Sequence, residues 1–113
     1  MCCRFGPYFV APVVAGLDKK SDTEYEPVIV NYDSIGCLDR AYDFQTCGTG
    51  SDFLLGVCEA FYKPDLGPDE LFEVVSNCLL SALDRDSLSG WGAYVYILTP
   101  EGVTCRALKT RMD

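Results

Sequence analysis

The sequence contains no histidine. Without an imidazole, Ser-His-Asp and Cys-His catalytic arrangements are excluded within this chain. Its seven cysteines include no Cys-x-x-Cys pair, which argues against zinc and iron–sulfur sites. Their odd number, irregular spacing and the lack of a leader-like N-terminal segment predict free thiols and a reducing compartment, cytosol or nucleus. No metal or cofactor is expected, and no apolar run approaches the ~20 residues that span a bilayer.

Basic residues are scarce, with 9 against 17 acidic residues and a formal net charge of −8. This balance argues against binding nucleic acid or anionic membrane surfaces, which both require clustered Lys and Arg. The charge is also uneven: nine acids and two bases lie between Asp33 and Glu73, whereas the tail is basic, with Arg106, Lys109 and Arg111. The acidic stretch is either a solvated face or a surface that docks on a partner.

The 113 residues suffice for one domain, residues 1–113, and the 49% hydrophobic content supplies material for a core. Runs rich in Val, Ile and aromatic residues predict five strands. Turn-forming segments separate them, and the first two strands should pair as a hairpin through the polar segment 18–26. The expected strands are Pro7–Leu17, Pro27–Ser34, Ala41–Cys47, Trp91–Leu98 and Val103–Leu108.

Two helices are predicted between the third and fourth strands. The first should start at a cap on Gly50 or Ser51 and end near Tyr62, because the residue before Pro64 avoids helical angles. The second should run from Pro68 to about Arg85, since proline and acidic residues favour a first helical turn. Apolar residues at helical spacing should face the core, namely Leu54, Cys58 and Phe61 in the first helix, and Leu71, Val75, Cys78 or Leu79, and Ala82 in the second.

This order of strands, helices and strands indicates an α+β fold with antiparallel hairpins. Two helices can cover one face of a sheet. However, Pro7–Leu17 and Trp91–Leu98 are apolar on both faces, which a sheet open to water on one side does not need. A further layer is therefore expected, from the rest of a larger fold or from a partner.

Three sequence features could carry chemistry, and each has a simpler structural interpretation. Asp84 and Asp86 could form a carboxylate pair, but polar residues in a tight turn usually hydrogen-bond the backbone. The segment Gly48-Thr49-Gly50-Ser51 could bind an anion, but it lacks the P-loop lysine, and a strand-to-helix turn is favoured. Removal of Met1 would expose Cys2 as an N-terminal nucleophile near Arg4, but no base is placed for it.

Several segments together resemble the β-type subunits of the 20S proteasome core. The turn Arg85-Asp86-x-x-Ser89-Gly90 is typical of that family, and the basic tail narrows the resemblance to one subunit type. The resemblance runs from Arg4 onward, whereas Met1-Cys2-Cys3 does not resemble the family. The segments that carry it are Arg4–Asp18, Asp33–Cys37, Asp43-Phe44, Cys47–Thr49, Gly56–Glu59, Leu71–Glu73, Asp84–Gly92 and Arg106–Asp113.

The resemblance implies a four-layer α/β/β/α sandwich of the N-terminal nucleophile hydrolase type. This chain would hold its C-terminal part, with three strands of one sheet, two of the other and one helical layer. The N-terminal strands and the opposite helical layer would be missing. The threonine nucleophile of active subunits and its Asp and Lys partners would also lie in the missing part, so no catalytic residue is assigned. Thr49, Asp86 and Ser89 match supporting positions and would be scaffold.

The function implied is that of a non-catalytic β subunit, which contributes to ring assembly in ubiquitin-dependent protein degradation, in cytoplasm and nucleus. Its partners would be neighbouring β subunits, the opposite β ring and α-ring subunits. The helices Ser51–Tyr62 and Pro68–Arg85 would face the opposite ring. Two alternatives stay open: an N-terminal nucleophile endopeptidase of the Thr or Cys type, and a truncated product that does not assemble.

Overall fold

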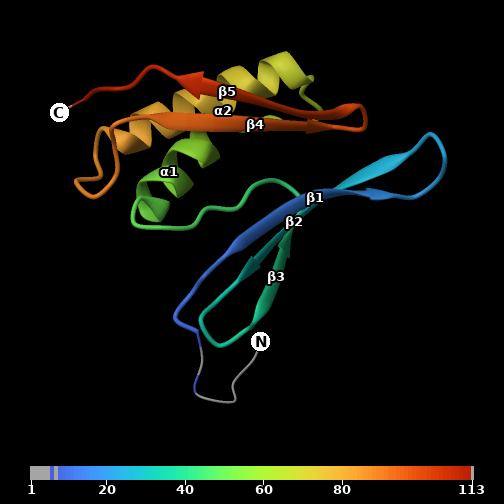
Figure 1. Cartoon of the computed structure of the whole chain (residues 1–113), viewed down its shortest axis with the longest axis horizontal. Helices are drawn as coiled ribbons and strands as arrows, with labels where there is room; N and C mark the ends of the chain where they lie inside the picture. Colours follow the sequence, from blue (N-terminus) through green and yellow to red (C-terminus); the bar gives the residue numbers. More distant parts are fainter. Residues whose placement is uncertain (1–5, 7, 113) are drawn as a thin grey trace. The chain divides into compact units, whose positions relative to one another are not determined.

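The computed structural model describes residue 6 and residues 8–112, which form two compact units divided between Gly48 and Thr49. Two helices and two antiparallel sheets confirm the α+β class, and Figure 1 traces them along the chain. The first unit holds only strands and the second holds both helices. The elements are β1 (Val13–Lys19), β2 (Tyr25–Tyr32), β3 (Leu38–Ala41), α1 (Ser51–Phe61), α2 (Pro68–Leu83), β4 (Ala93–Thr99) and β5 (Gly102–Leu108).

The first unit is a three-stranded antiparallel sheet in the order β1-β2-β3. The predicted hairpin of the first two strands is confirmed, with Val14 opposite Val30. Its turn is closed by the Ser21 hydroxyl, which accepts hydrogen bonds from the amides of Thr23 and Glu24. The first strand begins at Val13 rather than at Pro7, and Pro7 itself lies outside the described residues.

The third strand was predicted wrongly at Ala41–Cys47, since β3 spans Leu38–Ala41. The cause is a tight turn at Asp33, whose Oδ1 accepts hydrogen bonds from the amides of Ile35 at 3.0 Å and Cys37 at 2.8 Å. This turn brings Leu38 directly opposite Tyr32, so the chain re-enters the sheet earlier than its apolar residues suggest.

Both faces of this sheet carry apolar side chains together with charged ones. Because side chains alternate along strands and opposite partners share a face, the register assigns each residue to one side. No described residue of this unit is buried. The face that we call the Val14 face holds Val14, Val28, Val30, Tyr32 and Leu38 beside the charged Asp18, Glu26 and Arg40. The opposite Ala15 face holds Val13, Ala15, Leu17, Ile29 and Ala41 beside the polar Lys19, Asn31 and Asp39.

In the second unit, both helices form where they were predicted. α1 starts after Gly50 and ends before Lys63 and Pro64, and the predicted cap falls on Gly50, which has no side chain to bond with. α2 starts at Pro68 with Asp69 and Glu70 in its first turn, where acidic side chains favour the positive end of the helix dipole. It ends at Leu83, two residues before Arg85.

The hairpin of β4 and β5 covers part of α2, and Figure 1 shows it running alongside that helix. Val95 on β4 is 8% exposed, and Cys78 and Ala82 on α2 are each 3% exposed. β4 begins two residues later than predicted, because Trp91 and Gly92 have positive φ angles of 63° and 135°. These three side chains are the hydrophobic core of the described residues.

The other face of this hairpin, which we call the Tyr96 face, has no cover within its unit. Tyr94 is 67% exposed and Tyr96 is 69% exposed, with Val103 at 63%. The register places six side chains on this face: Tyr94, Tyr96, Leu98, Val103, Cys105 and Ala107. The sequence predicted that both faces of the strand at Trp91–Leu98 are covered. Within its unit, only the face that packs on α2 is covered.

The predicted core face of α2 is correct only towards its C-terminal end. Cys78 and Ala82 are buried, but Leu71 and Val75 are exposed. The apolar period identifies a stripe along a helix, but it does not say how far the covering layer extends. Among the residues of the described ranges, no helix is long and apolar enough to cross a membrane.

Candidate functional site

A cluster of two hydroxyls and one carboxylate forms where the start of α1 meets the segment after α2. Thr49 directly precedes α1, and its Oγ1 donates a hydrogen bond to Asp86 Oδ2 over 2.6 Å. Ser89 Oγ donates to the same oxygen over 2.7 Å. The two hydroxyl oxygens lie 3.3 Å apart. The structure thus brings together the three residues that the family resemblance marks as supporting positions.

The local backbone aims Asp86 at this point. Its other oxygen, Oδ1, accepts a hydrogen bond from the Leu88 amide at 3.1 Å, which folds the chain into a tight turn after α2. Gly50 permits the close approach of the two segments. A Cβ atom at this position would lie 3.1 Å from Asp86 Oδ2, closer than an ordinary van der Waals contact. A larger residue at 50 would therefore press on the cluster.

Hydrogen bonds also set the charge of the cluster. The bond from Thr49, followed by those from Ser89 and the Leu88 amide, holds the pKa of Asp86 below its usual value of 3.8. Asp86 is therefore ionised at neutral pH. Its hydrogen bonds join the start of α1 to the turn after α2.

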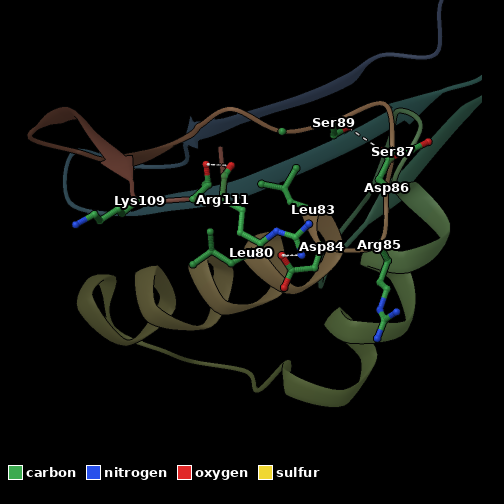
Figure 2. A pocket seen from close by; sticks show the side chains of 11 residues that line it. Leu80, Leu83, Asp84, Arg85, Asp86, Ser87, Ser89, Lys109 and Arg111 are labelled. Carbon is green, nitrogen blue, oxygen red and sulfur yellow. Dashed lines mark hydrogen bonds and ion pairs between the residues drawn. The ribbon is translucent and has the colours of Figure 1, made fainter. Parts of the chain in front are cut away.

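Asp84 and Asp86, considered as a carboxylate pair, point to different partners. Asp84 Oδ1 lies 3.8 Å from the Arg111 guanidinium, and Figure 2 shows Arg111 reaching back from the tail to this helix end. Asp86 instead accepts hydrogen bonds from the hydroxyls of Thr49 and Ser89. The two carboxylates do not share a site, in agreement with the turn interpretation.

A cavity of about 450 Å³ lies beside the cluster, between the end of α2, the turn that follows it and the C-terminal tail. Leu80 and Leu83 contribute apolar side chains to it, and in Figure 2 the Lys109 side chain points away from these leucines. The ion pair of Asp84 and Arg111 closes one side. Its lining is Leu80, Leu83, Asp84, Arg85, Asp86, Ser87, Ser89, Gly90, Lys109, Thr110 and Arg111.

Of the remaining sequence candidates, the described residues include only the glycine segment. A Cβ atom at Gly50 would lie 3.1 Å from Asp86 Oδ2. The negative Asp86 carboxylate therefore already lies where the glycine segment before α1 could have bound an anion. Cys2 and Arg4 lie outside the described residues. Within the described ranges, no group of three or more His, Cys, Asp and Glu side chains could hold a metal ion.

The cysteines of the described residues fall into two groups. Cys58 on α1 and Cys78 on α2 pack as small apolar residues, and burial, together with the neighbouring Cys78, raises the pKa of Cys58 to about 11. Cys37, Cys47 and Cys105 are exposed. All five are free thiols.

Sequence reasoning from motifs did not find the cluster, because Thr49 is 37 residues from Asp86. The family resemblance did mark its members. The sequence profile described as "Proteasome subunit" matches residues 2–98. The chain belongs to the proteasome subunit family.

Individual members of this proteasome subunit family agree on the subunit type. The chain is 56% identical to proteasome subunit beta type-3 of Saccharomyces cerevisiae over 110 residues, which are 97% of the chain. It is 54% identical to proteasome subunit beta type-3 of Drosophila melanogaster and 50% identical to that of Caenorhabditis elegans over the same share. The subunit type to which the basic tail narrows the resemblance is therefore beta type-3.

The chain spans about half the length of these curated relatives, 52% in each case. The matched residues begin at position 2, so Cys2 and Cys3 fall within the family match. The expectation that Met1-Cys2-Cys3 does not resemble the family is therefore wrong for these two cysteines.

Proposed function

We propose that the chain serves as a non-catalytic structural β subunit of the 20S proteasome core, in the cytoplasm and nucleus, and contributes to β-ring assembly. The observation that carries the proposal is the identity of 56% to a beta type-3 subunit along 97% of the chain. The hydroxyl cluster is compatible with a structural role, because Asp86 accepts hydrogen bonds from both hydroxyls and so joins the start of α1 to the turn after α2.

The finer fold in this proposal is an incomplete four-layer sandwich formed by a single domain. The β1–β3 and β4–β5 sheets would be its two central layers, with α1 and α2 as one outer layer. Support comes from the two antiparallel sheets, the apolar side chains on their faces and the contact of α2 with β4. The partners would be neighbouring β subunits, the opposite β ring and α-ring subunits.

The acidic stretch contributes to this proposal mainly through the helices. Asp33 is committed to its own turn, and Asp43 accepts a hydrogen bond from the Phe44 amide. Asp52, Asp69 and Glu70 lie instead in the first turns of α1 and α2. Under the proposal, the helical layer presents this charge to the opposite ring, where charge complementarity sets specificity more than affinity.

Incorporation into particles tests the proposal. The tagged chain is expressed in Saccharomyces cerevisiae cells in which the resident beta type-3 subunit is depleted, together with the part of that subunit that the chain does not span. Native gels and mass spectrometry of 20S particles should show the chain at a stoichiometry comparable to that of the other β subunits. A chain that is expressed but never enters the particles would support the truncated, non-assembling alternative and contradict the proposal.

The peptidase alternative has its own test. Fluorogenic peptides are incubated with the purified chain and with a Cys2→Ser variant. The proposal expects no difference in turnover between the two. Turnover that depends on Cys2 would favour an N-terminal nucleophile peptidase instead.

A further inference from the structure

Two cysteines from different helices lie together in the second unit. α1 and α2 pack against each other, and Figure 1 shows the two helices side by side. Cys58 lies on α1 and Cys78 lies on α2, and their side chains form a hydrogen bond. Cys78 is 3% exposed, whereas Cys58 is half-buried. The packing of the helices therefore holds two free thiols in direct contact, and solvent reaches one of them.

Packing alone does not account for this pair. A buried cysteine behaves as a small hydrophobic side chain, so an apolar residue at either position would fill a similar space. Ala82 on α2 is such a residue, and it is as buried as Cys78. Two sulfur atoms in contact differ from two apolar side chains in their chemistry, because oxidation can join them by a bond.

The surroundings of the pair act in opposite directions on the rate and on the equilibrium of that oxidation. Burial, followed by the effects of Cys78, raises the pKa of Cys58 to about 11. Because the thiolate is the form that attacks a disulfide, reaction at neutral pH is slow. Contact between the thiols favours the product, since a neighbouring group has a high effective concentration. We therefore expect slow formation of a favoured disulfide.

We propose that Cys58 and Cys78 are a redox-sensitive pair, which a low-molecular-weight disulfide such as glutathione disulfide oxidises to a disulfide bond between α1 and α2. In the first step, Cys58 Sγ attacks one sulfur of glutathione disulfide, forms a mixed disulfide and releases one glutathione. In the second step, Cys78 Sγ attacks Cys58 Sγ and releases the second glutathione. The chain loses two electrons and two protons, which the two glutathione thiols carry. Only Cys58, the more exposed thiol, has to meet the oxidant.

The new bond joins α1 to α2 covalently. It closes a loop that contains the end of α1, the connection at residues 62–67 and most of α2. Such a cross-link restricts the unfolded chain and so favours the folded one. By linkage, the folded chain favours the disulfide by the same factor. The inference concerns the chain itself and does not rest on the proposed function.

Equilibration in a glutathione redox buffer tests the inference. The full chain is incubated with a mixture of glutathione and glutathione disulfide, once in native buffer and once in concentrated urea. The reaction is quenched with acid, and the disulfides are identified by mass spectrometry of unreduced peptides. Hydrogen exchange of α2 and β4 checks that the chain and each variant are folded in native buffer.

The native sample should contain the Cys58–Cys78 disulfide, with an equilibrium constant at least about tenfold larger than in urea. Amides in α1 should exchange more slowly in the oxidised chain than in the reduced chain. The matched control moves the thiol by one residue, because Cys58→Ser combined with Glu59→Cys places it at an exposed position of α1. This control should lose the tenfold preference and should form a mixed disulfide with glutathione at position 59.

Three results would overturn the inference. The first is an equilibrium constant in native buffer that is no larger than in urea. The second is oxidised Cys58 that occurs only as a mixed disulfide with glutathione or in a bond to Cys105. The third is a control variant that links position 59 to Cys78 as readily as the parent chain links Cys58. Each result would show that the folded chain does not hold the two thiols in place for a bond.

Discussion

The two units of the chain differ in how they bury apolar residues. All the buried side chains among the described residues, Ser76, Cys78, Ala82 and Val95, belong to the second unit. The first unit is rich in Val and Ile, but it buries none of them. The two units differ in their layers: α2 lies against β4, whereas the described residues of the first unit form no helix that could cover the β1–β3 sheet. Apolar composition supplies a core only when a second layer meets it.

The largest expected effect comes from breaking the core of the second unit. Ala82→Asp places a charge at a site that is 3% exposed, so the free energy of unfolding of that unit should fall by about 3 kcal/mol or more. Ser81→Asp, one residue earlier and exposed, is the matched control, and its cost should stay within about 0.5 kcal/mol. Urea denaturation followed by peptide-resolved hydrogen exchange measures both.

The comparison predicts that Ala82→Asp changes hydrogen exchange less in β1–β3 than in α2 and β4, because the substituted residue lies in the core of the second unit. Equal losses of protection in both units would contradict it.

A smaller effect is expected from the hydroxyl cluster. Asp86→Asn removes the charge that accepts hydrogen bonds from Thr49, Ser89 and the Leu88 amide. Amide exchange should rise at the start of α1 and in the turn after α2, whereas Asp84→Asn should change it little, because its ion pair with Arg111 is exposed. If the two variants behave alike, the cluster does not hold these segments together.

The same cluster predicts a dependence on acid. The folded pKa of Asp86 is lowered, so its stabilisation is present above the unfolded value of 3.8 and is lost as pH falls through the folded pKa. An acid titration monitored by circular dichroism should show this loss below pH 3.8 in the parent chain. The difference in stability between the parent chain and Asp86→Asn should shrink over that pH range. A difference in stability that stays constant with pH would contradict a stabilising role of the ionised Asp86 carboxylate.

At alkaline pH the half-buried thiol of Cys58 should change stability in the opposite direction, with a loss as pH rises. The pKa of Cys58 is raised from 9.0 to about 11, so its contribution is complete below pH 9 and declines as pH rises towards 11. At neutral pH Cys58 and Cys78 should react with iodoacetamide more slowly than Cys105, which is exposed. Equal alkylation rates for Cys58 and Cys105 would show that the α1–α2 contact opens readily.

The smallest effect is expected in the first unit, at its surface ion pairs. Glu26 lies 3.3 Å from Lys20 and 3.6 Å from Arg40, and all three side chains are at least one-third exposed. Glu26→Gln should lower stability by about 1 kcal/mol or less. A loss as large as that of Ala82→Asp would mean that the first unit depends on polar contacts and that the contrast between the units is mistaken.

Local signals in the sequence predicted most of the secondary structure. Pro68 with Asp69 and Glu70 located the start of α2, and Lys63-Pro64 located the end of α1. The third strand was misplaced, because the Asp33 carboxylate closes a tighter turn than the apolar pattern indicates. Leu71 and Val75 were misassigned to the core, because a helical period does not reveal which stretch of the helix is covered.

The candidate site was predictable only in part. Turn chemistry around Asp86 was expected from the sequence, and the Leu88 amide bond agrees with it. The convergence of Thr49 and Ser89 on one carboxylate oxygen joins residues far apart in the chain, which spacing does not reveal. The family resemblance named these residues, and the structure supplied their geometry.

Hydrogen exchange of the chain alone tests the central contrast most directly. The account predicts slow exchange in α2 and β4, which share the core of Cys78, Ala82 and Val95, and rapid exchange across β1–β3. Amides in β1–β3 that exchange as slowly as those in α2 and β4, under conditions where the chain is monomeric, would contradict it.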